Sequence, residues 1–262
     1  MIRALFSAAS GMYAQQLGVD TIANNLANVN TTGYKKSKVE FQDLIYQSLR
    51  AAGASSVEGV MVPTELQVGH GVRPVAVQKN FSQGAPRATE NPLDIAIMGN
   101  GFFQISMPDG TTNYSRDGSF KINSEGAIVT SDGFYVEPQI TIPVDTTSVN
   151  ISNDGIVSVL VVGSNEAQEV GQIELAKFIN AGGLKNVGQN MYVHTEASGE
   201  PVLGSPSTEG YGLLNQGYLE ASNVQVVEEM VNMIVAQRAY ELNSKSIRTS
   251  EEMLQMANNI KR

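Results

Sequence analysis

The sequence predicts an α+β protein in which long N- and C-terminal helices flank a mainly antiparallel all-β domain. Apolar residues recur every seven positions at both ends of the chain, which is the spacing of helices that pack along a narrow stripe. Between these ends, short apolar and β-branched runs are separated by Asp-Gly and Glu-Gly pairs, which favour hairpin turns. We therefore expect a helical core from residues 1–30 and 223–262, an extended arm over 31–70, and a β domain over 71–222.

The first predicted helix runs from Ile2 to Val29. Gly11 and Gly18 lie inside it, and each weakens an isolated helix by about 1 kcal/mol, so the helix needs a partner. Turn-forming residues from Asn28 to Gly33 end it. Its predicted seam consists of Leu5, Met12, Val19, Ile22 and Leu26.

The second predicted helix runs from about residue 223 to 260, and Ser222–Gln225 has the pattern of a capping box at its start. Several positions of its seam are polar, which fits a multi-helix assembly in which polar residues fix the register. Those polar positions are Gln237, Ser244, Glu251 and Asn258. The apolar seam consists of Val226, Met230, Met233, Tyr240, Ile247 and Leu254.

The middle of the chain carries the turn signals. Because Pro63 and Gly69 interrupt any continuous helix, residues 31–70 are expected to be extended or partly helical. Residues 182–206 are rich in Gly, Asn, Ser and Pro, which predicts long loops between strands. Hairpins are predicted at Asp109-Gly110, Asp117-Gly118, Glu125-Gly126, Asp132-Gly133 and Asp154-Gly155.

Composition excludes several classes of function. The 262 residues contain 17 Lys and Arg against 26 Asp and Glu, a net charge of −9, which argues against nucleic acid or an anionic membrane as the main partner. There is no cysteine, and the two histidines, His70 and His194, cannot form a three-histidine zinc site. No apolar run approaches the roughly 20 residues that span a bilayer, and no cleaved signal peptide is recognisable. We therefore expect no catalytic residue, cofactor, metal or membrane insertion.

A few patterns imitate sites of chemistry. Residues 183–188 have the glycine spacing of a phosphate-binding loop, but Gln189 and Asn190 replace its Lys and Ser/Thr. Paired carboxylates for glycan hydrolysis would come from aspartates that mostly precede glycine, where a turn already explains them. A periplasmic glycan hydrolase is kept as the alternative from a different class. Its candidate residues are Asp94, Asp109, Asp117, Asp132 and Asp154.

The heptad stripes leave two interpretations open. An antiparallel helix pair inside one subunit would explain them, and so would a seam between copies of the chain. Residue spacing does not decide between the two.

Six groups of residues resemble the bacterial flagellar rod and hook family. The N-terminal group is residues 23–35, the central groups are 99–103 and 114–120, and the C-terminal groups are 217–224, 228–231 and 237–241. Length and residues 66–74 are similar to the distal rod members, with proximal rod and hook subunits as close alternatives. The signature residues are Asn25, Asn28, Thr31, Gly33, Tyr34, Gln237, Arg238 and Tyr240.

The resemblance implies a structural subunit of a hollow helical tube that transmits motor torque to the hook. It implies that the terminal helices pack together as an inner, coiled-coil-like core, with the β domain outside and residues 31–70 locking neighbouring subunits. The implied partners are further copies of the chain, proximal rod proteins, the hook protein, the P and L rings and the flagellar type III export apparatus. The implied location is the basal body across the periplasm, reached without a cleaved signal peptide. From the seams we expect the chain ends to be largely unfolded before assembly.

Overall fold

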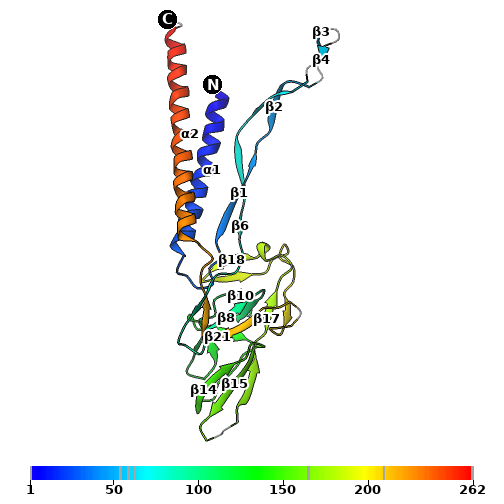
Figure 1. The fold of residues 1–262 in the computed structure, drawn as a ribbon, viewed down its shortest axis with the longest axis vertical. Coiled ribbons are helices and arrows are strands. Elements are labelled where there is room, and N and C mark those ends of the chain that lie inside the picture. Colours follow the sequence, from blue (N-terminus) through cyan, green and yellow to red (C-terminus); the bar gives the residue numbers. More distant parts are fainter. Residues whose placement is uncertain are drawn as a thin grey trace. The chain divides into compact units, whose positions relative to one another are not determined.

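The computed structural model describes residues 2–52, 55–57, 60–61, 63–163, 166–208 and 210–260. It confirms the α+β class: a helix stands at each end of the chain and antiparallel strands lie between them (Figure 1). Two compact units are present, one made of residues 1–26, 37–78 and 225–262, the other of residues 27–36 and 79–224. The predicted division into core, arm and β domain stays a prediction, and its residues 1, 53, 54, 58, 59, 62, 164, 165, 209, 261 and 262 lie outside the described ones.

The first unit contains both helices, α1 (Ile2–Ala27) and α2 (Val226–Ile260), which lie side by side and run in opposite directions. Each helix departs from its predicted boundary by two or three residues. The predicted capping box is wrong, because the Ser222 hydroxyl accepts a hydrogen bond from the backbone N–H of Val224 at 3.3 Å. This closes a short turn two residues long, and the helix begins only after it.

The arm of the first unit consists of strand pairs and contains no helix among its described residues. β1 pairs with β6, β2 pairs antiparallel with β5, and β3 pairs antiparallel with β4. The strands are β1 (Ser37–Asp43), β2 (Tyr46–Arg50), β3 (Ser55–Val57), β4 (Val60–Met61), β5 (Leu66–Gly69) and β6 (Val72–Lys79).

The second unit is built around a nine-stranded antiparallel sheet, in which β9 is the central strand. β9 pairs with β10 along one edge, and with β13 and then β17 along the other. The strands are β9 (Phe102–Ser106), β10 (Thr112–Ser115), β11 (Lys121–Ile122), β12 (Ile128–Val129), β13 (Tyr135–Glu137), β17 (Leu175–Lys177), β18 (Lys185–Gly188), β19 (Met191–Val193) and β20 (Val202–Gly204).

Three smaller sheets complete the second unit. β14, β15 and β16 form a three-stranded antiparallel sheet, β21 pairs with β8, and β22 pairs with β7. The 3-10 turn Ala181–Gly183 precedes β18. The strands are β7 (Pro86–Ala88), β8 (Ile95–Met98), β14 (Thr146–Ile151), β15 (Ile156–Val161), β16 (Gln168–Gln172), β21 (Leu213–Gln216) and β22 (Tyr218–Glu220).

Four of the five predicted hairpin turns are present, and each joins two consecutive antiparallel strands. The exception is Asp117-Gly118, where no hairpin forms. Here the backbone of Ile95 lies directly against Gly118, and the Ile95 N–H donates to the Gly118 carbonyl at 3.0 Å. The glycine therefore serves a close backbone approach and not a chain reversal.

The prediction of long loops over residues 182–206 is wrong in its first half. β18 and β19 form a hairpin there, joined by Gln189 and Asn190 with φ angles of 53° and 59°. Two consecutive residues with positive φ make the tight turn that matches the twist of a hairpin. Gln189 and Asn190, which replace the Lys and Ser/Thr of a phosphate-binding loop, therefore form the hairpin turn.

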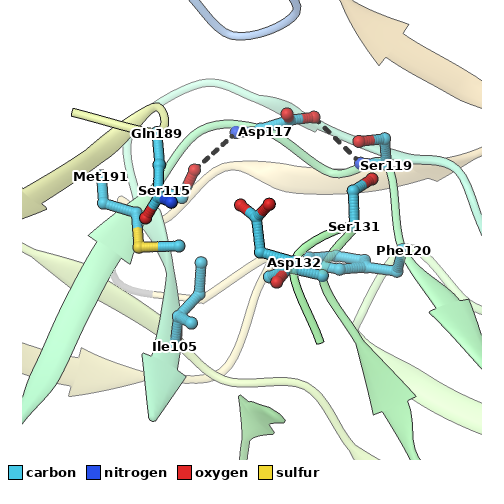
Figure 2. A pocket seen from close by; sticks show the side chains of 10 residues that line it. Ile105, Ser115, Asp117, Ser119, Phe120, Ser131, Asp132, Gln189 and Met191 are labelled. Carbon is cyan, nitrogen blue, oxygen red and sulfur yellow. Dashed lines mark hydrogen bonds between the residues drawn. The ribbon is translucent and has the colours of Figure 1, made fainter. Parts of the chain in front are cut away.

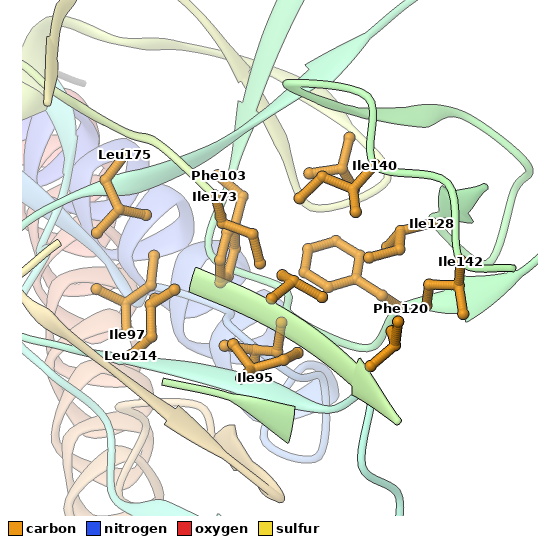
Figure 3. Packing of buried hydrophobic residues seen from close by; sticks show 14 of the residues in the cluster. Ile95, Ile97, Phe103, Phe120, Ile128, Ile140, Ile142, Ile173, Leu175 and Leu214 are labelled. Carbon is orange, nitrogen blue, oxygen red and sulfur yellow. The ribbon is translucent and has the colours of Figure 1, made fainter. Parts of the chain in front are cut away.

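One apolar core lies between the main sheet and the three-stranded sheet (Figure 3). Side chains alternate along β9, so Phe103 and Ile105 enter this core while Phe102 belongs to a second cluster on the other face. In the second cluster Phe102, Phe178 and Tyr192 make edge-to-face contacts with centroids 5.7 and 6.0 Å from Phe102. Both faces of β9 are thus buried, which fixes its register.

Candidate assembly site

The two helices contact each other through small and polar residues. A side chain at Gly11 would meet the Asn243 amide nitrogen at 2.8 Å, so the backbone of α1 approaches α2 closely there. At the other end of the pair, Asn25 donates to the Glu229 carboxylate at 3.3 Å. The two contacts are fourteen residues apart on each helix, which is the register of an antiparallel pair. Ala8, Ala14 and Ala236 are also buried.

The predicted seam residues lie near this contact but are covered unequally. All five of the α1 seam are half-buried, as are Met233 and Ile247 of the α2 seam. The remaining α2 seam residues stay exposed, at 41 % for Val226, 50 % for Met230, 42 % for Tyr240 and 37 % for Leu254. Their role in contacts between copies stays a prediction.

Sequence reasoning missed a second apolar face on α2. At 3.6 residues per turn, this face lies on the opposite side of the helix from Glu229, Ala236 and Asn243. Its side chains are 54 to 76 % exposed. The signal was present in the sequence as a second stripe with the spacing four, three and eight. We name it the outer face: Val227, Val231, Ile234 and Leu242.

The helix α1 also carries exposed apolar side chains. Ile2, Phe6 and Tyr13 are 66, 68 and 62 % exposed. They recur at intervals of four and seven, so they share one side of the helix. Both helices of the pair therefore present large apolar residues that the described part of one chain does not cover.

Three buried charges form a cluster in the second unit, which we name the charged clasp: Lys35, Arg116 and Glu220. The Lys35 ammonium donates to one carboxylate oxygen of Glu220 at 2.6 Å, and the Arg116 guanidinium to the other at 3.4 Å. The side chains are 1, 4 and 1 % exposed. Burial lowers the pKa of Lys35 and of Arg116, while the attraction of Glu220 opposes both shifts.

Backbone groups complete the charged clasp. Lys35 also donates to the Ser82 carbonyl at 2.8 Å, and the Gly84 N–H donates to Glu220 at 2.7 Å. Arg116 donates to the Gly99 carbonyl at 2.7 Å, whereas its buried Nε has no hydrogen-bond partner among the described residues. Because these charges are buried and each has several partners, removal of any one partner is expected to destabilise the second unit.

Asn223 links its own segment of the chain to those around Lys36 and around Ser82. Its side-chain oxygen accepts from the Lys36 N–H at 2.7 Å, and its amide donates to the carbonyls of Asn80 and Ser82 at 2.8 and 3.1 Å. The N–H of Asn80 donates in turn to the Lys36 carbonyl at 2.8 Å. Through Glu220 and Asn223, the C-terminal group of residues 217–224 therefore binds the N-terminal group at Lys35 and Lys36.

The signature residues fall into different environments. Gly33 has a φ of 67°, and a Cβ there would lie 2.7 Å from the backbone of Arg116, so only glycine fits. Tyr34 is buried, with the Lys79 ammonium 4.2 Å from its ring centre. Asn25 holds the backbone of Ser37 through its N–H and its carbonyl. Thr31 donates to Asn28 at 3.2 Å.

The C-terminal signature residues are exposed on α2. Arg238 pairs with Glu241 at 2.8 Å, with both side chains more than 60 % exposed, so this pair contributes little to stability. Gln237 and Tyr240 are exposed as well. These three residues belong to the first unit and the charged clasp to the second, and their role stays a prediction.

The carboxylates proposed for hydrolysis do not form a site of sufficient size. Asp117 and Asp132 line the same pocket, and Figure 2 shows the Asp132 carboxylate directed into it. Its volume of about 40 Å³ is far below the roughly 300 Å³ of a small-molecule site. Asp117 accepts from the Ser119 N–H at 3.1 Å, which is a turn contact. The structure thus supplies a local backbone role for this aspartate.

His70 and His194 lie apart in sequence and in different units. The described residues contain no group of three or more His, Asp or Glu side chains placed to hold a metal ion. Neither described helix is both long and apolar enough to cross a membrane.

Comparison with known proteins gives the family. Three family models match in order along the chain: flagella basal body rod protein over residues 5–35, flagellar hook protein FlgE/F/G D1 domain over 96–159, and flagellar basal body rod FlgEFG protein C-terminal over 215–260. A flagellar basal-body rod protein FlgG of Borreliella burgdorferi is 54 % identical over the whole of both chains. The protein of that name in Bacillus subtilis is 40 % identical, again over both whole chains.

Caulobacter vibrioides offers a comparison within one organism. Its FlgG is 49 % identical, over 99 % of this chain and all of its own, whereas its flagellar basal-body rod protein FlgF is 34 % identical over 98 and 97 %. Identity of this level over whole chains shows the family. The chain belongs to the flagellar basal-body rod protein family, and it matches the FlgG members along its entire length.

Proposed function

We propose that this chain is the distal rod subunit of the flagellar basal body, and that its copies polymerise head-to-tail into a hollow helical tube. The tube would carry motor torque across the periplasm to the hook. The higher identity to FlgG than to FlgF in one organism favours the distal subunit over a proximal one. The single observation that carries polymerisation is the outer face of α2, which one chain leaves open although the helix is already paired.

The outer face supports polymerisation for an energetic reason. Val227, Val231, Ile234 and Leu242 are more than half exposed, and apolar surface gains about 25 cal/mol for each Å² removed from water. A monomer that kept such a stripe in water would be prone to associate. Neighbouring copies that cover the outer face would be held together by the hydrophobic effect, which also stabilises a protein core.

The arm supports the same proposal. Ile45, Tyr46, Leu49 and Leu66 lie in or next to the β2–β5 pair and are 51 to 83 % exposed. A two-stranded ribbon with exposed apolar residues is at best marginally stable alone. We propose that it packs on adjacent subunits and stiffens the tube.

The helix pair itself should be marginal before assembly. Its closest contacts involve glycine, alanine and asparagine, which bury little apolar area. We propose that the amides of α1 and α2 exchange rapidly in the free subunit and become protected in the polymer. Full protection in the monomer would contradict this.

We further propose contacts with proximal rod proteins and the hook protein at the two ends of the tube, and with the P and L rings around it. Passage through the flagellar type III export apparatus would place the chain in the basal body. The glycan hydrolase alternative gains no support from the pockets described above: the one that two aspartates line has a volume of about 40 Å³.

The test is polymerisation of the purified chain, followed by light scattering and electron microscopy as the concentration is raised. The variant Ile234→Asp puts a charge on the outer face at a residue 56 % exposed in one chain, so folding should change by less than about 0.5 kcal/mol. Burial of that charge between subunits should raise the polymerisation threshold at least ~30-fold. Asn232→Asp adds the same charge on the other side of α2 and should polymerise normally.

Two further variants sharpen the test. A chain lacking residues 224–262 should form no tubes. Met233→Asp, at a half-buried seam position, should both destabilise the helix pair and block assembly. Tubes from the truncated chain, or normal assembly of Ile234→Asp, would show that the helices do not form the contacts between subunits.

A further inference from the structure

Helix α2 carries four of the ten methionines of the chain, between Met230 and Met256. Three of these have exposed side chains, at 50 % for Met230, 48 % for Met253 and 57 % for Met256, whereas Met191 in the second unit is 3 % exposed. The chain has no cysteine, so all of its sulfur is in thioethers. An oxidant in solution therefore reaches the exposed thioethers of α2 before the buried one.

Met253 and Met256 extend the outer face toward the C-terminal end of α2. Met253 follows Leu242 by eleven residues, which is about three turns of helix, and Met256 follows Met253 by three. Both side chains therefore lie on the same side of α2 as the four residues of the outer face. We name Met253 and Met256 the methionine pair.

The described part of α1 does not reach the methionine pair. The two contacts between the helices, at Gly11 and at Asn25, set an antiparallel register in which Ile2 lies opposite Glu252. The methionine pair lies beyond that point, where α2 extends past α1 (Figure 1). Both thioethers are therefore open to solvent even though the helices are paired.

Oxidation changes the methionine pair from apolar to polar. Hydrogen peroxide transfers one oxygen atom to the thioether sulfur: its O–O bond breaks, an S–O bond forms, and the remaining atoms leave as water. The sulfur is oxidised by two electrons and the peroxide is reduced by two. The new oxygen accepts hydrogen bonds, so burying it without a donor is unfavourable. Sulfoxides on the outer face would weaken a contact that depends on removing apolar surface from water.

We propose that the methionine pair is an oxidation site that controls polymerisation, because peroxide converts free subunits into a form that does not join the tube. This inference rests on the proposed function, since the sulfoxides act on the contact between subunits. In the tube the outer face is covered and the same two sulfur atoms are protected. Oxidation therefore acts on subunits before assembly, and methionine sulfoxide reductases, which are specific for one epimer each, restore them.

The first measurement locates the modification. Purified free subunits are treated with hydrogen peroxide and digested, and mass spectrometry follows the oxygen gained at each methionine. Met253 and Met256 should oxidise at least about tenfold faster than Met191 in the free subunit, and at least about fivefold more slowly in rods than in the free subunit. Equal rates in either comparison would overturn the proposal.

The second measurement links the modification to assembly. Oxidised subunits should need an about tenfold higher concentration to polymerise than reduced subunits of the same chain, and the reductases should return the threshold to within about twofold. In the double variant Met253→Leu with Met256→Leu, which keeps apolar side chains of similar volume, peroxide should change the threshold by less than about twofold. The control Met98→Leu removes a methionine that is 37 % exposed in the second unit, and it should keep the full response to peroxide.

The outcomes separate the oxidation site from the proposed function. Rods from fully oxidised subunits at an unchanged threshold would overturn the oxidation site alone. A response to peroxide that persists in the double variant would place the effect at another methionine, such as Met230, and would overturn the oxidation site too. Failure of reduced, unaltered subunits to polymerise at any concentration would overturn both proposals.

Discussion

Glu220 neutralises two buried cations at once, so its removal should have a large effect on the second unit. In Glu220→Gln the neutral amide replaces a carboxylate that lies 2.6 Å from the Lys35 ammonium and 3.4 Å from the Arg116 guanidinium. The amide has only one oxygen that can accept a hydrogen bond, so it can bind only one of the two cations. Its NH₂ group then points at the N–H donors of the other cation. Loss of one partner of a buried ion pair costs about 3–5 kcal/mol, because the remaining charges stay desolvated.

Urea unfolding measures this cost. The chain has no tryptophan, so the near-ultraviolet signal of buried tyrosines such as Tyr114 and Tyr192 reports on the second unit. With a slope of about 1–3 kcal/mol per M urea, the midpoint should fall by at least about 1 M. The matched control is Glu241→Gln, which breaks an ion pair whose side chains are 75 and 63 % exposed and should cost less than about 1 kcal/mol. An equal, small effect of both substitutions would refute the reasoning.

Three further predictions concern single positions. Burial raises the pKa of Tyr192 well above its usual range, so the folded state keeps a proton that the unfolded state loses above pH 10. The free energy of unfolding should therefore fall by up to about 1.4 kcal/mol per pH unit above pH 10, and Tyr192→Phe should remove that part of the slope in alkaline urea titrations. Gly33→Ala should destabilise the second unit by more than about 2 kcal/mol, since a Cβ would lie 2.7 Å from backbone atoms at a φ of 67°. By contrast, Gly18→Ala, where nothing lies within 4 Å, should stabilise α1 by about 0.5–1 kcal/mol, and thermal melts in which both variants moved the same way would contradict this pair.

The heptad spacing predicted the two helices because a period of seven over four repeats is a strong local signal. The spacing could not predict which face of each helix contacts the other helix. Residues at the seam of α2 divide between half-buried (Met233) and exposed (Val226), while the outer face around Ile234 is apolar as well. Two stripes on one helix look alike in sequence, and only the position of α1 distinguishes them.

The charged clasp was beyond sequence reasoning for a different reason. Lys35, Arg116 and Glu220 are ordinary surface residue types, and such residues are usually exposed. Their burial depends on pairing across separations as large as 185 residues, which no local pattern encodes. The resemblance drew attention to the neighbouring Gly33 and Tyr34, but their physical role became clear only from the contact of Gly33 with the backbone of Arg116.

The Asp-Gly pairs show the limit of a good local rule. Three Asp-Gly pairs and Glu125-Gly126 form hairpins, whereas Asp117-Gly118 serves a contact with Ile95. The two uses of glycine, positive φ and absence of a side chain, are indistinguishable until the neighbouring strand is known.

The span of the charged clasp also limits when the second unit can fold. Lys35 meets Glu220 across 185 residues, and Asn223 binds the backbone of Lys36 across 187. During synthesis Lys35 leaves the ribosome first, and its ammonium lacks the Glu220 carboxylate until residue 220 has followed. Contacts of such high sequence separation form slowly. The second unit therefore cannot close the charged clasp before nearly the whole of its chain has been made.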